Sequence, residues 1–206
     1  METLYICQIP YFEYYDGTEA PNIPACMNFL PVEIMGEDGA SLERRFGPGS
    51  GGNTLPAPCS AAIADAAGED GIVRDATVVF CAKADSGAVV TVGWYRHANV
   101  TSKPEHLPMT DEEGGDFEHP FFFCTALENA VLLPTDVRFQ PMWQIPRVRA
   151  AKGAQRAKPG LNAAGFWIVD ENADSFRRAF LENITAYEQN GDNLLSPCEE
   201  TSEDEA

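Results

Sequence analysis

The sequence predicts a single α+β domain in which β-strands precede one C-terminal helix. Two runs of β-branched and aromatic residues, 77–82 and 89–95, flank the turn signal Asp85-Ser86-Gly87, which is the pattern of a β-hairpin. Near the end of the chain, apolar residues recur three and four positions apart, as in an amphipathic helix. The chain has 206 residues and is 44% hydrophobic, which suffices to bury a core of single-domain size.

The first predicted element is a short apolar strand over residues 4–9, which Pro10 ends. An aromatic cluster that contains Tyr11 and Tyr14 follows it. Residues 17–72 are rich in Gly, Pro and Ala and show little periodicity, so we expect a long loop region there.

After the hairpin, two further apolar runs are expected to form strands or a short helix. They cover residues 120–126 and 130–134, and a polar, acidic connection over residues 110–118 precedes the first of them. The sequence therefore places most of its strands in the middle of the chain.

The C-terminal helix is predicted to begin at Asp174 as its N-cap and to stop at Asn190-Gly191. Its apolar face consists of Phe176, Phe180, Leu181, Ile184 and Tyr187. We place one domain over residues 1–190 and expect residues 191–206 to form a disordered acidic tail.

Net charge is −18, which argues against nucleic acid as a partner, but the charge is unevenly distributed. No acidic residue occurs between Asp136 and Asp170. That interval contains six basic residues, Arg138, Arg147, Arg149, Lys152, Arg156 and Lys158. Two interpretations stay open, a solvated loop and an edge that contacts phosphates.

The chain is expected to be cytoplasmic and not to enter a membrane. Its N-terminus lacks the basic flank and apolar stretch of a secretory signal, and no apolar run approaches the roughly 20 residues that span a bilayer. The six cysteines are scattered without zinc or redox spacing, so we expect reduced, structural thiols.

No catalytic motif is present, and we expect a protein without cofactor or metal that is not an enzyme. The three histidines have no second His or Cys at ligand spacing. One enzymatic alternative stays open, a metal-dependent nucleic-acid-processing site. It would be assembled from Asp111, Glu113, Asp116 and His119.

Aromatic and amide side chains supply the chemistry of base recognition. Trp94 ends a predicted strand, Asn99 follows it, and Trp167 comes directly after the basic interval. Aromatic faces stack on bases and an amide reads a base edge, the combination that holds an extruded base in a pocket. The alternative is that these tryptophans fill the core.

The order of several motifs resembles bacterial proteins of the restriction and defence repertoire. Asn28-Phe29-Leu30-Pro31 precedes the hairpin strand that continues through 94–100, and then come 130–134 and the box Gly165-Phe166-Trp167. The hairpin is also similar to the central hairpin of the PUA-like superfamily, particularly its EVE and YTH branches. This resemblance implies a small, twisted β-barrel flanked by helices, in which an aromatic cage holds a modified or flipped base.

Together these observations predict a non-catalytic domain that binds nucleic acid, DNA rather than RNA. A separate nuclease would act on the nucleic acid that this domain recognises. The predicted base-binding residues are Trp94 and Trp167 as stacking walls, Tyr11 or Tyr14 as a third, and Asn28 and Asn99 at the base edge. The predicted phosphate-binding residues are Arg147, Arg149, Lys152, Arg156 and Lys158.

Two further alternatives stay open. In the first, the chain is an acidic DNA mimic or protein-interaction module whose carboxylates imitate phosphates. In the second, its acidity marks only a salt-adapted proteome.

Overall fold

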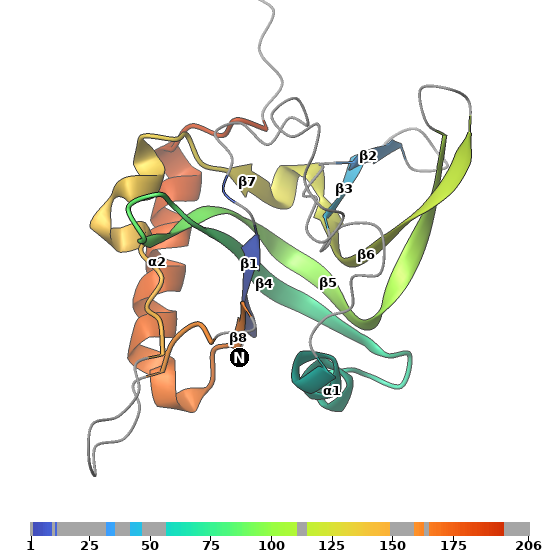
Figure 1. The fold of residues 1–206 in the computed structure, drawn as a ribbon, viewed down its shortest axis with the longest axis horizontal. Helices are drawn as coiled ribbons and strands as arrows, with labels where there is room; N and C mark the ends of the chain where they lie inside the picture. Colours follow the sequence, from blue (N-terminus) through green and yellow to red (C-terminus); the bar gives the residue numbers. More distant parts are fainter. Residues whose placement is uncertain are drawn as a thin grey trace, which may run out of the picture.

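A curved, eight-stranded sheet forms the centre of the protein in the computed structural model (Figure 1). The structure describes residues 2–9, 11, 32–35, 42–46, 57–110, 115–148, 159–162 and 165–195. The strands are β1 (Leu4–Ile9), β2 (Val32–Met35), β3 (Leu42–Phe46), β4 (Ile72–Lys83), β5 (Val89–Thr110), β6 (Asp116–Ala126), β7 (Ala130–Leu132) and β8 (Phe166–Ile168). The α-helices are α1 (Ala57–Ala66) and α2 (Asp174–Asn190), and the 3-10 helices are η1 (Leu127–Asn129), η2 (Val137–Phe139), η3 (Pro141–Trp143) and η4 (Glu171–Ala173).

The predicted hairpin is confirmed as β4 and β5, which pair antiparallel around the turn at 84–88. The strand predicted over 4–9 is confirmed as β1, which pairs in parallel with β4 and antiparallel with β8. β6 and β7 both pair with β5, and they contain most of the two apolar runs predicted over 120–126 and 130–134. The middle of the chain thus provides the centre of the sheet.

The prediction of a long loop over 17–72 is wrong where β2, β3 and α1 lie. The two strands are only four and five residues long, and α1 contributes one described residue, Ile63, to a buried core. Elements this short, or with so narrow an apolar face, leave little periodicity in the sequence.

The bounds predicted for the C-terminal helix are confirmed in α2, which ends at Asn190 with Gly191 as its C-cap. Its predicted N-cap is wrong, because Asp174 is already the first helical residue and Ala173 is the N-cap. The Asp174 carboxylate instead accepts hydrogen bonds from Arg177 and Arg178, one turn further along the helix.

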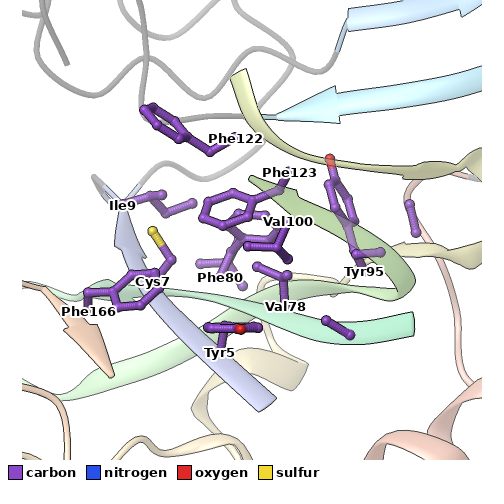
Figure 2. Close-up of a cluster of buried hydrophobic side chains, with 14 of the residues drawn as sticks. Tyr5, Cys7, Ile9, Val78, Phe80, Tyr95, Val100, Phe122, Phe123 and Phe166 are labelled. Atoms are coloured by element: carbon purple, nitrogen blue, oxygen red, sulfur yellow. The ribbon is translucent and has the colours of Figure 1, made fainter. Parts of the chain in front are cut away.

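Both faces of the central strands are buried, so alternate residues of each strand belong to different cores. Tyr5, Cys7 and Ile9 pack in the core that contains Ile63 of α1, called here the α1-side core (Figure 2). Leu4 and Ile6 pack in the core that contains Phe180 and Ile184 of α2, called here the α2-side core. The two helices therefore cover different sides of the sheet.

The sheet is open among the described residues, because β2 and β8 end the strand order and do not pair with each other. The coarse prediction, an α+β fold with a C-terminal helix, is confirmed. Closure into a small barrel is not seen in the parts of the chain that the structure describes.

Residues 191–195 are ordered against β7, so the predicted disordered tail is wrong for its first five positions. The Asn193 amide behaves like a peptide group: its Oδ1 accepts from Leu132 N at 2.9 Å and its Nδ2 donates to Ala130 O at 2.9 Å. Leu194 N then donates to Leu132 O at 3.0 Å. The remainder of the predicted tail, 196–206, lies outside the described residues.

Cys81 is a buried free thiol. Burial raises the pKa of the Cys81 thiol well above its ordinary value, so this group stays protonated. Among the helices that the structure describes, none combines the length and the apolar character needed to cross a bilayer.

Candidate functional site

Trp94 and Trp167 lie in one row on the α2 side of the sheet. Trp167 pairs with Ile6, Ile6 with Val79, and Val79 with Trp94, so the two indoles are three strand spacings apart. At about 4.8 Å per spacing the separation is roughly 14 Å. Trp94 is 0% exposed and Trp167 is 9% exposed.

Aromatic side chains fill the space between these two indoles. Trp167 stacks on Phe176 with ring centroids 5.1 Å apart, and Phe176 stacks on Phe180 at 5.3 Å. Phe180 meets Trp143 edge-on at 5.9 Å, and Trp143 stacks on Trp94 at 5.3 Å. The expectation that two indoles face each other across a hollow is therefore wrong: the apolar face of α2 and Trp143 occupy that space, and no base reaches the Trp94 ring.

The other predicted base-binding residues are not brought together. Asn99 is exposed on β5, five positions from the buried Trp94, which corresponds to about 17 Å of extended strand. Tyr11 is half-buried and packs against the α1-side core, with its ring 6.3 Å from that of Phe139. Asn28 and Tyr14 lie outside the described residues.

Of the predicted phosphate-binding residues, Arg147 is described, and it is exposed. Arg138, a further member of the basic interval, is completely buried, and its Nε donates to Leu133 O at 2.9 Å. Arg138 therefore supports the chain locally and cannot contact phosphates. Arg149, Lys152, Arg156 and Lys158 lie outside the described residues.

The alternative metal site also falls largely outside the described part of the chain. Asp111 and Glu113 are not described, and only the backbone pairing of Asp116 and His119 with β5 is described. No group of three or more metal-binding side chains occurs among the residues whose positions are described.

A pocket of about 710 Å³ opens at the N-terminal end of α2. The β4–β5 turn forms one wall with Gly87, Ala88 and Val89, residues 144–147 form a second, and Phe176 of α2 forms a third. Gln144 pairs with Val90 across an isolated bridge, and Ile145 N donates to Val89 O at 2.9 Å. The second wall is thus held against the edge of β5.

The described ends of the basic interval are fixed beside this pocket. Arg147 and Leu161 form a parallel bridge, supported by Val148 N donating to Leu161 O at 3.1 Å and Leu161 N donating to Pro146 O at 2.8 Å. A Cβ on Gly160 would lie 2.7 Å from Pro146 O, so this approach of the two segments requires glycine.

The pocket brings together an aromatic ring, an amide and a guanidinium. Phe176 is half-buried and is backed by the stacked ring of Trp167, while Gln144 and Arg147 are exposed. Arg147 is the one charged residue in the lining, and no carboxylate lines the pocket among the described residues. In a chain of net charge −18, this composition favours an anionic ligand with a flat ring.

Sequence reasoning found Arg147 but missed Gln144 and Phe176 as site residues. Gln144 lies between Trp143 and Ile145, which enter the core, and its exposure depends on the bridge to Val90. Phe176 belongs to the apolar helix face, and nothing in that periodicity shows that one ring borders a pocket.

Comparison with known proteins gives no match to a family model, a curated protein or a solved structure. The site must therefore be interpreted from its own geometry and charge.

Proposed function

We propose that the protein is a non-catalytic nucleic-acid-binding domain that accepts a base in the pocket at the N-terminal end of α2. The observation that carries this proposal is the pocket lining, in which Phe176, Gln144 and Arg147 meet and no described carboxylate takes part. These three groups supply stacking, edge recognition and charge neutralisation, the three interactions that a nucleotide offers.

Phe176 takes the stacking role that the sequence assigned to Trp94. Its ring is half-buried, and the Trp167 ring at 5.1 Å holds it from behind. A base that stacks on Phe176 extends the aromatic row outward, so Trp167 contributes indirectly. Stacking on a protein ring contributes about 1–3 kcal/mol per base.

Gln144 is placed to read the base edge. Its backbone is held by the bridge to Val90, and the neighbouring Trp143 O accepts a hydrogen bond from Thr91 Oγ1 at 2.9 Å. An amide on a fixed backbone presents an NH2 donor group beside a carbonyl acceptor, which suits paired hydrogen bonds to a base.

Arg147 supplies a phosphate contact at the rim. Its Nη2 makes one long contact with Gln8 Oε1 at 3.4 Å, and among the described residues its other donors make no hydrogen bond. The basic residues Arg149, Lys152, Arg156 and Lys158 follow in the sequence and are proposed to add phosphate contacts.

The finer features of the proposal derive from the motif resemblance. They are a PUA-like barrel, a modified or flipped base as the feature recognised, DNA rather than RNA, and a separate nuclease in a cytoplasmic restriction or defence system. The pocket supports the choice of an unstacked base, because a ring can reach Phe176 only outside a base stack.

Fluorescence anisotropy with labelled oligonucleotides tests the proposal. Single strands, unmodified duplexes and duplexes with a modified base are titrated at low salt. We expect binding of at least one class, with log–log salt dependence near 0.7–0.9 per phosphate contact.

Phe176→Ala should weaken that binding about tenfold, because a stacking partner is lost. Phe139→Ala is the matched control, since Phe139 is 45% exposed and does not line the pocket. Absence of binding to all three classes would overturn the proposal, as would equal affinity of Phe176→Ala and the wild type.

A further inference from the structure

The pairing of β4 and β5 has three register shifts, and the first two are bulges that compensate each other. Between Val73 and Ala76, β4 contains one extra residue relative to β5, and between Ala76 and Val78 the extra residue is in β5. Asp75 in the first bulge has φ 56°, and His97 in the second has φ 50°. The left-handed region is unfavourable for residues with a Cβ, so this arrangement is a specific local feature.

The two strained residues are joined to each other: His97 Nδ1 and Asp75 Oδ1 are 2.6 Å apart. Together the bulges keep Ala76 and Ala98 in the α1-side core. They also leave Arg96 on the opposite side of the sheet, where it lines a second pocket. Bulges commonly redirect a side chain towards a functional site.

This second pocket, of about 420 Å³, lies between the sheet and α2. Glu2 and Arg96 line its sheet side, and α2 lines the other side with residues between Arg178 and Gln189. Leu181 is among these and gives the pocket an apolar part. It shares no lining residue with the pocket at the N-terminal end of α2.

The Arg96 guanidinium is incompletely satisfied. Its Nε and Nη1 are buried and make no hydrogen bond with any residue that the structure describes. The nearest carboxylate oxygen, Glu2 Oε1, is 3.4 Å from Nε, and it also accepts a hydrogen bond from the Thr77 hydroxyl. A guanidinium stays charged, and its buried donors are costly when they lack acceptors.

A hydrogen bond from β6 holds the backbone of Arg96. Its backbone carbonyl accepts a hydrogen bond from Thr125 Oγ1 at 2.6 Å, and its side chain is 18% exposed. A guanidinium presents a planar fork of N–H donors, which matches the two oxygens of a carboxylate.

We propose that this pocket binds a small molecule that carries a carboxylate on an apolar body. The carboxylate replaces that of Glu2, which is 30% exposed, at the Arg96 guanidinium, and the apolar body lies against Leu181 and Ala186. Arg96 and Arg178 balance Glu2 and Glu182 in formal charge, so a monoanion is tolerated better than a phosphate dianion.

Nuclear magnetic resonance titration of the full chain with benzoate and hexanoate tests this assignment. We expect saturable shifts at the Thr185 and Gln189 amides and at the Arg96 Nε–H. Benzamide and hexanamide, the matched neutral compounds, should produce none, and inorganic phosphate should bind at least tenfold more weakly than benzoate.

Two variants and a control make the test specific. Arg96→Met should weaken benzoate binding at least tenfold, whereas Glu2→Gln should strengthen it, because the competing carboxylate is removed. Arg74→Met is the control, since Arg74 is exposed on β4 and pairs with Asp70 away from the pocket.

The proposal is overturned if the wild type shows no shifts with either acid, if the amides or phosphate bind as well as benzoate, or if Arg96→Met binds unchanged. If Arg96→Met does not fold, Glu2→Gln and the neutral compounds decide the question.

Discussion

The indole N–H of Trp94 donates a hydrogen bond to Glu188 Oε1 at 2.8 Å and so joins the centre of the sheet to α2. The same ring stacks on Trp143 and meets Tyr187 edge-on at 5.8 Å. Because Trp94 is wholly enclosed in this way, its role is to hold α2 on the sheet.

Trp94→Ala should therefore lower the free energy of unfolding by about 3–5 kcal/mol, the usual cost of removing a buried tryptophan. Urea denaturation measures this change. Glu188→Gln keeps an oxygen acceptor for the indole and should cost less than about 1 kcal/mol. A Trp94→Ala protein with wild-type stability and no affinity for nucleic acid would restore Trp94 as a stacking wall.

The sequence predicted α2 and the β4–β5 hairpin because their signals are local. The apolar periodicity of α2 ends at Asn190-Gly191, and the turn at 85–87 separates two β runs. The position of Trp94 was less accessible to prediction, since an aromatic residue on a strand suits a core and a binding wall equally. The choice depends on Trp143 and α2, which are far from Trp94 in the sequence and contact its ring only in the folded protein.

The candidate site could not be predicted from the sequence for the same reason. Its walls come from residues 87–89, 144–147 and Phe176, which are far apart in the chain. The bridge between Val90 and Gln144 brings the first two walls together. No local sequence pattern predicts an isolated bridge. Charge counting likewise could not separate exposed Arg147 from buried Arg138.

Arg147→Gln should weaken nucleic-acid binding uniformly across sequences and reduce the log–log salt slope by about one unit, because one phosphate contact is lost. Affinities measured at several salt concentrations give this slope. Lys103→Gln removes the same charge from an exposed position of β5 outside the pocket and should leave the slope unchanged. Equal slopes for the two variants would remove Arg147 from the site.

Gly93→Ala should destabilise the fold by at least about 2 kcal/mol, as overpacking against backbone does. A Cβ at this position would lie 2.2 Å from Val131 O, so β7 would have to move away from β5. Gly68→Ala is the control, because its nearest neighbour is the flexible Asp70 carboxylate at 3.3 Å. Thermal unfolding compares the variants, and a stable Gly93→Ala protein would contradict the close approach of β7.

The hydrogen bond from Arg177 holds the pKa of the Asp174 carboxyl below its ordinary value. A lowered folded-state pKa means that ionised Asp174 stabilises the fold above the unfolded-state pKa, and that this contribution is lost as pH falls through the folded-state pKa. Asp174→Asn should therefore be less stable than the wild type at neutral pH, and the difference should vanish in acid.

An NMR titration of the Asp174 carboxyl group measures directly whether its pKa is lowered. Arg177→Met should return the pKa of Asp174 towards its ordinary value, because the first cause of the shift is removed. An Asp174 pKa at or above the ordinary value in the wild type would contradict the pairing.

Deletion of residues 196–206 should leave nucleic-acid affinity unchanged or improve it, whereas an acidic decoy would lose affinity for its DNA-binding partner. The deleted segment follows Leu195 in the sequence, whereas the pocket lies at the N-terminal end of α2, a helix of 17 residues that is about 25 Å long. Anisotropy titrations of both proteins make the comparison.

The deletion must begin after Leu195. Removing Asn193 as well would expose the backbone of β7, so a truncation at 193 serves as a control for damage to the fold. Weaker nucleic-acid binding after deletion of 196–206 alone would contradict this prediction.

All three tryptophans of the chain, Trp94, Trp143 and Trp167, belong to the α2-side core. Intrinsic tryptophan emission therefore reports whether α2 is docked and gives no direct signal from the opposite core around Ile63. If the domain melts cooperatively, this emission and far-ultraviolet circular dichroism must lose their native signals at the same denaturant concentration. A fluorescence transition that precedes the dichroism change would identify α2 as the element that detaches first.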